Sequence, residues 1–146
     1  MNSASPVHAA INATHRYQRE PAGLDVWQTP AEFDDTGVGD CEDFAIAYWH
    51  ALRDAPGRAY VAWCWRGREA HMVCLYYQPG DTDPQVLDVA VDAVCGLSER
   101  PDLRVVVRFN RDGVWLGLTP AIAAPSRLWT DVLASMNVVS EREPTP

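Results

Sequence analysis

Gly39-Asp40-Cys41-Glu42-Asp43-Phe44-Ala45 is the stretch that decides the fold of this 146-residue chain. It opens a run in which apolar side chains recur at helical spacing, so the run predicts a helix from Cys41 to about Asp54 with one apolar face. The residues on that face are Cys41, Ala45, Tyr48, Trp49 and Leu52. Asp40 occupies the N-cap position, and Pro56 with Gly57 ends the helix. The stretch therefore predicts a helix that begins at a cysteine.

Further helices and a group of strands are expected around this element. The expected helices are Pro6 to about Arg19 with Ser5 as its cap, a short helix starting near Thr29-Pro30 after a break at Pro21 to Gly23, and Ser126 to about Val138. The expected strands are Ala59 to Trp65, Ala70 to Tyr77, Val86 to Val91, Leu103 to Phe109 and Val114 to Leu118, the first two forming a hairpin. Helices followed by an antiparallel sheet predict an α+β fold. We expect one domain over residues 1–146, with a flexible tail from about residue 140.

Charge and composition limit the kinds of partner. Twelve Lys plus Arg against twenty Asp plus Glu give a formal net charge of −8, which argues against nucleic acid and anionic membranes. An acidic surface suits weak cation binding or a basic or neutral polypeptide substrate. The start of the chain has no apolar signal-peptide core, and the uncharged run Gly113 to Ser126 is too short to span a bilayer. We therefore expect a cytoplasmic protein with no membrane insertion, whose four cysteines are reduced.

Cys41 is the candidate nucleophile. The N–H groups of a first helical turn are unpaired, and together with the helix dipole they favour a thiolate over a thiol. A lone cysteine is more often a small buried apolar residue, and position alone leaves that alternative open.

His71 is the candidate base, and Asp88 is its candidate partner. If the strand that starts near His71 pairs with Val86 to Val91 through a loop centred between Pro79 and Gly80, His71 lies opposite Asp88. Asp88 would then hold the imidazole in one tautomer, as the acid of a catalytic triad does. Asp92 has the same strand parity and is the alternative partner, and a structural histidine beside a surface acid is the simpler interpretation.

The remaining histidines and cysteines are interpreted as structural. His8 and His15 on the N-terminal helix and His50 on the Cys41 helix are expected to be surface or packing residues. Cys64, Cys74 and Cys95 lie in apolar strand contexts, without a CxxC or histidine-rich spacing of the kind that binds zinc. Proximity of Cys64 to His71 across the hairpin leaves an auxiliary redox role open.

Three carboxylates surround the candidate nucleophile. Asp40, Glu42 and Asp43 would oppose a Cys41 thiolate by like-charge repulsion. Clustered side-chain oxygens suit Ca²⁺, and a bound divalent cation would reverse this effect. The alternative is that Asp40 only caps the helix while Glu42 and Asp43 complement its dipole.

Five segments together resemble the bacterial transglutaminase-like cysteine peptidases. They are Ile11-Asn12, Asp25 to Phe33, Gly39 to Ala47 with its Gly-Asp-Cys-Glu-Asp box, His71-Met72-Val73 and Val86-Leu87-Asp88. The likeness covers roughly Val7 to Trp115. It implies a papain-like α+β fold and a triad of Cys41, His71 and Asp88. In the best-known branch, a periplasmic protease clips a surface adhesin and depends on calcium held by acids around the nucleophile, which here would be Asp40, Glu42 and Asp43.

Two departures from that branch bear on the substrate. Family members usually continue the third block as Leu-Asp-Asn and follow the box helix with a lysine, where this chain has Val89 and Tyr48. Because no export signal is seen, the adhesin substrate is not expected to carry over.

We therefore expect a cysteine endopeptidase in which His71 deprotonates Cys41 and Asp88 orients His71. The oxyanion donors would be the Cys41 backbone N–H and the Trp27 indole. The alternatives are amide transfer to an amine or hydrolysis of a cell-wall peptide on the same triad, or a non-catalytic adaptor that keeps the fold. The sequence does not fix the oligomeric state.

Overall fold

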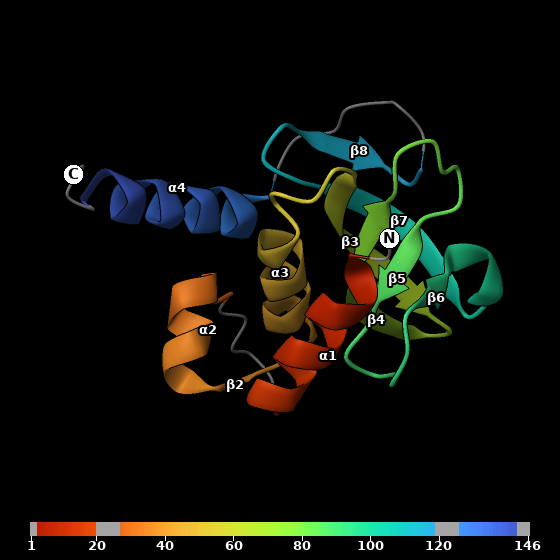
Figure 1. Ribbon diagram of the computed structural model, residues 1–146, viewed down its shortest axis with the longest axis horizontal. Coiled ribbons are helices and arrows are strands. Elements are labelled where there is room, and N and C mark those ends of the chain that lie inside the picture. Colours follow the sequence, from red (N-terminus) through yellow and green to blue (C-terminus); the bar gives the residue numbers. More distant parts are fainter. Residues whose placement is uncertain (1–2, 20–26, 119–125, 143–146) are drawn as a thin grey trace.

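A six-stranded sheet with helices against one face forms the centre of the structure (Figure 1). The computed structural model describes residues 3–19, 27–118 and 126–142. The strands are β3 (Arg58–Arg66), β4 (Glu69–Tyr77), β5 (Gln85–Leu87), β6 (Cys95–Gly96), β7 (Leu103–Phe109) and β8 (Val114–Leu116). They lie in the order β6-β5-β4-β3-β7-β8, and every neighbouring pair is antiparallel. The predicted α+β class is confirmed.

Among the described residues, four α-helices accompany the sheet: α1 (Ala4–Thr14), α2 (Pro30–Thr36), α3 (Cys41–Ala51) and α4 (Arg127–Arg142). Helix α3 packs on β4 and β3, and α1 and α2 pack on α3. Helix α4 leads away beyond α3, so that the C-terminal end of the described chain lies apart from the sheet (Figure 1). Within the described residues, no helix is long and apolar enough to cross a membrane.

Helix α3 begins at Cys41, as predicted, because Asp40 is in an extended conformation and its N–H donates to Asp43 Oδ2 at 3.1 Å. It ends at Ala51, earlier than the predicted end near Asp54. Its buried residues lie on more than one face, because the sheet covers one side while α1 and α2 cover others. They are Glu42, Asp43, Phe44, Ala45, Ile46, Ala47, Tyr48 and Trp49. The predicted single apolar stripe was therefore too narrow.

The β3–β4 hairpin is confirmed. Arg66 pairs with Glu69 across a turn in which Gly67 has a φ of 61°, a value that favours glycine. The two faces of the hairpin enter different clusters. Met72, Cys74 and Tyr76 pack with α3 in the larger core, whereas Val73 and Leu75 belong to a second cluster on the other face of the sheet.

Several boundaries differ from those predicted. Helix α1 starts at Ala4, so Ser5 lies inside it rather than at its cap, and it ends at Thr14. The chain then leaves the helix to form β1 (Arg16–Tyr17), which pairs in parallel with β2 (Val38–Gly39); neither short strand was predicted. Strand β8 stops at Leu116 before Gly117, whose φ is 53°.

Helices α2 and α4 begin where predicted. Thr29 and Glu32 form a capping box at the start of α2, and the Ser126 hydroxyl accepts from Trp129 N–H at 3.2 Å at the start of α4. Helix α4 continues to Arg142, past the predicted end near Val138. The predicted break at Pro21 to Gly23 and the last residues of the expected tail, 143–146, lie outside the described residues.

Candidate active site

Cys41 lies at the first position of α3, beside the strand that carries His71. The thiol is half-buried and donates to Glu42 Oε2 at 3.3 Å. Burial raises the pKa of this thiol, the charge of Glu42 raises it further, and a backbone hydrogen bond from Met72 acts in the opposite direction. Because Met72 follows His71 directly, this contact brings the sulfur to the start of β4. These surroundings favour the neutral thiol of Cys41 over the thiolate.

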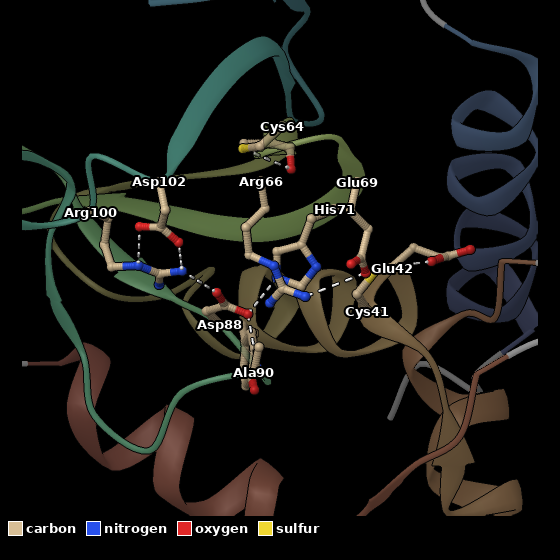
Figure 2. Close-up of polar contacts among 12 residues, drawn as sticks. Cys41, Glu42, Cys64, Arg66, Glu69, His71, Asp88, Ala90, Arg100 and Asp102 are labelled. Carbon is tan, nitrogen blue, oxygen red and sulfur yellow. Dashed lines mark hydrogen bonds and ion pairs between the residues drawn. The ribbon is translucent and has the colours of Figure 1, made fainter.

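His71 is buried and bonded to Asp88. Its Nε2 lies 2.7 Å from Asp88 Oδ1. Since an ionised carboxylate only accepts hydrogen bonds, Nε2 carries the proton and Nδ1 is left as the acceptor nitrogen. In Figure 2 the imidazole lies between Asp88 on one side and Cys41 on the other.

The structure makes the predicted contact through a different register. Cys74 pairs with Leu87 and Leu75 with Val86, which is two positions away from a register in which His71 faces Asp88. Strand β5 ends at Leu87 instead of continuing to Val91, because Asp88 turns the chain: its Oδ1 accepts from Ala90 N–H at 2.9 Å. The Asp88 side chain reaches His71 from this turn, and Asp92 is exposed.

Asp88 is held ionised by the groups around it. Burial alone would raise the pKa of this fully buried carboxyl, but hydrogen bonds and charge from His71, with hydrogen bonds from Ala90 and Arg100, lower it to about 2. Arg100 donates to Asp88 Oδ2 at 3.0 Å, so the two carboxylate oxygens face different partners. Asp88 is therefore a fixed negative charge at neutral pH.

Arg100 is a site residue that sequence reasoning missed. Its guanidinium is buried and also bonds both oxygens of Asp102, through Nε at 3.1 Å and an NH₂ group at 3.0 Å. Arg100 thus bridges Asp88 to a neighbouring carboxylate and fixes the direction of the Asp88 side chain (Figure 2). It follows a three-residue 3₁₀ turn, η1 (Leu97–Glu99), and no local spacing links it to His71.

His8 is a second residue of this region whose interpretation was incomplete. It is buried, and its Nε2 donates to the backbone carbonyl of Asp88 at 2.9 Å. Neighbouring Asn12 accepts from the Tyr48 hydroxyl. The signal that could have found this contact was Ile11-Asn12, one of the segments on which the family resemblance rests. Helix α1 therefore supports the backbone of the turn that carries Asp88.

The three acids around Cys41 do not converge as a set of ligands. Asp43 is turned away from the thiol, because its oxygens accept from the backbone N–H of Gln28 at 2.9 Å, the Gln28 side chain at 3.2 Å and Asp40 N–H. Among the residues that the structure describes, no group of three or more His, Cys, Asp or Glu side chains is arranged to hold a metal ion. Burial raises the pKa of Asp43 to about 6. Asp40 Oδ1, in contrast, is buried without a hydrogen-bond partner.

The remaining candidates lie outside this cluster. The Trp27 indole stacks in parallel on Phe109, with ring centroids 6.0 Å apart. Cys64 pairs across the hairpin with His71, and Cys74 is buried in the larger core. All four cysteines are free thiols.

The fold is similar to that of solved LapG structures. LapG of Legionella pneumophila, in an EGTA-treated form, is 29% identical, with a TM-score of 0.78 over 91% of this chain and 77% of that chain. Calcium-bound LapG of the same organism is 28% identical, with a TM-score of 0.76 over 90% of this chain and 79% of that chain. No family model matches the chain, and no curated protein matches it by sequence.

A thiol at a helix start beside a histidine on the adjoining sheet, in a fold of this similarity, defines a cysteine peptidase of the papain-like class. Within that class, the similarity to LapG supports the resemblance to the bacterial transglutaminase-like cysteine peptidases.

Proposed function

We propose that Cys41, His71 and Asp88 form a catalytic triad that hydrolyses peptide bonds in a polypeptide substrate. The observation that carries this proposal is the buried 2.7 Å bond between His71 and Asp88, next to the strand residue that bonds the Cys41 sulfur. A buried charged carboxylate on an imidazole is the arrangement that a general base requires.

Each residue has a distinct role in this reaction. Asp88 keeps the proton of His71 on Nε2, so that Nδ1 accepts the proton of the Cys41 thiol. The thiolate attacks the substrate carbonyl, the protonated His71 gives its proton to the leaving amine, and a water molecule activated by His71 then hydrolyses the thioester. The Cys41 backbone N–H at the helix start is the first donor for the oxyanion, and the Trp27 indole is the second candidate.

A calcium ion fits two of the three acids. The orphaned Asp40 Oδ1 needs a partner, and Glu42 lies on the other side of Cys41 in sequence, so these two carboxylates are the ligands we propose. Asp43 is better assigned to the hydrogen bonds that fix the start of α3. Bound calcium would supply positive charge that offsets the effect of Glu42 on the thiol. The calcium-bound form of LapG supports this assignment.

Mass spectrometry of candidate polypeptides incubated with the protein tests the triad. We expect new termini with the native protein and with Cys95→Ala, and none with Cys41→Ala. An added primary amine distinguishes hydrolysis from transfer, because transfer would leave the amine on the product. Equal cleavage by Cys41→Ala and native protein would rule out the proposed nucleophile, and an iodoacetamide rate at Cys41 no higher than that of free cysteine would favour an adaptor.

A further inference from the structure

A surface hollow of about 410 Å³ lies at the end of α3 that is remote from Cys41. Three arginines from three separate segments line it. Arg53 follows α3, Arg58 begins β3, and Arg111 lies in the turn between β7 and β8. Eleven residues of α3 rise by about 16 Å, so this hollow is distinct from the candidate active site.

The hollow concentrates positive charge on an acidic protein. The chain has twelve Lys plus Arg and a formal net charge of −8, yet three of those twelve cationic side chains line this one place, with Asp112 as the acidic residue of the lining. This positive charge also acts on the neighbouring His50. Burial lowers the pKa of His50, and the charges of Arg53 and Arg111 lower it further. An anion that most of this surface would repel is attracted here.

Aromatic residues also line the hollow. Tyr60 and Trp115 lie edge to face with centroids 5.4 Å apart, and the Arg108 guanidinium lies 4.9 Å from the first ring and 5.5 Å from the second. Arg111 lies over the ring of Trp49 at 5.9 Å. The stacked guanidiniums and rings hold one another in place. Ring atoms of Trp49, Tyr60 and Trp115 therefore line the hollow beside its arginines.

We propose that this hollow, the arginine hollow, docks an acidic segment of the polypeptide that the candidate active site cleaves. This inference rests on the proposed peptidase function. The planar guanidinium fork matches a carboxylate with two hydrogen bonds, and the aromatic part of the lining offers apolar contact to a neighbouring side chain. Its three arginines are exposed, and the hollow is open to solvent. This shape suits an extended polypeptide better than a small anion, which would be bound in a more enclosed site. An extended linker of about five residues would span the length of α3 to Cys41.

Peptide binding by fluorescence anisotropy tests the arginine hollow apart from catalysis. The protein is the full chain carrying Cys41→Ala, and the probes are a labelled Asp-rich peptide and the same peptide with Asn in place of every Asp. In this background we compare Arg53→Glu/Arg58→Glu with the control Arg104→Glu/Arg127→Glu, which makes the same change in net charge at exposed positions elsewhere. We expect the Asp-rich peptide to bind more tightly than its Asn counterpart, and only the first double variant to weaken it, by about tenfold or more.

Three results would overturn the docking role. They are equal binding of the two peptides, an equal loss with both double variants, and complete displacement by inorganic phosphate at a concentration equal to that of the peptide, which would mark a small-anion site. Cleavage assays with the native protein read the triad separately. Peptides that bind through Arg53 and Arg58 without being cleaved would contradict the proposed function and leave the anion-binding surface intact.

Discussion

The two carboxylate oxygens of Asp88 accept hydrogen bonds from different groups. Oδ1 accepts from His71 and from the backbone of Ala90, whereas Oδ2 accepts from Arg100. The sequence predicted the contact between His71 and Asp88 from an assumed pairing of their two strands. That pairing was wrong by two residues, but a two-residue error keeps each side chain on the same side of its strand. Arg100 could not be predicted in this way, since its place depends on how β6 and η1 fold back beside β5.

The acid stability of the protein should depend on Asp88. Its pKa is lowered from 3.8 to about 2 in the folded state, so the stabilisation is present above pH 4 and is lost as the pH falls towards 2. Relative to Asp88→Asn, we expect the native protein to lose about 2 kcal/mol of unfolding free energy over that interval. Urea unfolding at a series of pH values measures this difference. The exposed Asp92→Asn is the control, and parallel curves for native protein and Asp88→Asn would contradict the prediction.

Arg100 should act on catalysis through Asp88. Replacing it with Gln removes one of the interactions that lower the pKa of Asp88, so the acid limb of the kcat/KM profile should move to higher pH. We expect kcat/KM at neutral pH to fall by about tenfold, because the Asp88 side chain also loses its direction. Arg100→Lys should restore part of this loss. A fall in kcat/KM with no movement of the acid limb would indicate a purely structural role, and the exposed Arg104→Gln should leave both unchanged.

Among the elements, those with a strong local pattern were predicted and those formed by distant pairing were not. Helix α3 and the β3–β4 hairpin have clear periodicity and turn residues. The parallel pair of β1 and β2 consists of two-residue strands joined by hydrogen bonds from Arg16 N–H to Gly37 O and from Gln18 N–H to Gly39 O, both 2.8 Å long. Such short segments carry no periodic signal. The early end of β5 likewise reflects the Asp88 turn rather than any break in its apolar run.

Trp129 should contribute strongly to the attachment of helix α4 to the rest of the fold. Trp129 is 1% exposed, lies 4.8 Å from the Phe109 ring and 5.0 Å from the Trp49 ring, and its indole N–H donates to Asn110 O at 3.1 Å. We expect Trp129→Ala to lower the unfolding free energy by about 3–5 kcal/mol. Chemical denaturation followed by circular dichroism measures the change, and the exposed Asp131→Ala should alter it by less than about 0.5 kcal/mol. A loss of this smaller size with Trp129→Ala would show that the packing of α4 contributes little to stability.

At the scale of the whole molecule, the excess of acids has an uneven distribution. The arginine hollow gathers positive charge at one end of α3, and two carboxylates flank the thiol at the other end. A net charge of −8 destabilises a folded chain through self-repulsion, and binding a divalent cation at the acidic end would relieve part of it. Stability and activity should therefore respond to calcium together.

Calcium should raise the unfolding temperature of the native protein, and a chelator should reverse the effect. A ligand that binds only the folded state adds about 2.7 kcal/mol at a concentration one hundred times its dissociation constant, so the shift should grow with calcium concentration. Asp40→Asn and Glu42→Gln should each abolish it, because each removes a proposed ligand, while the exposed Asp35→Asn should respond as the native protein does. Thermal scans with and without calcium measure the stability, and iodoacetamide rates at Cys41 measure the reactivity of the thiol. Calcium should also speed alkylation, because it offsets the Glu42 charge that raises the pKa of the thiol. If calcium changes neither the unfolding temperature nor the alkylation rate, the calcium proposal is wrong and Asp40 serves only as a helix cap.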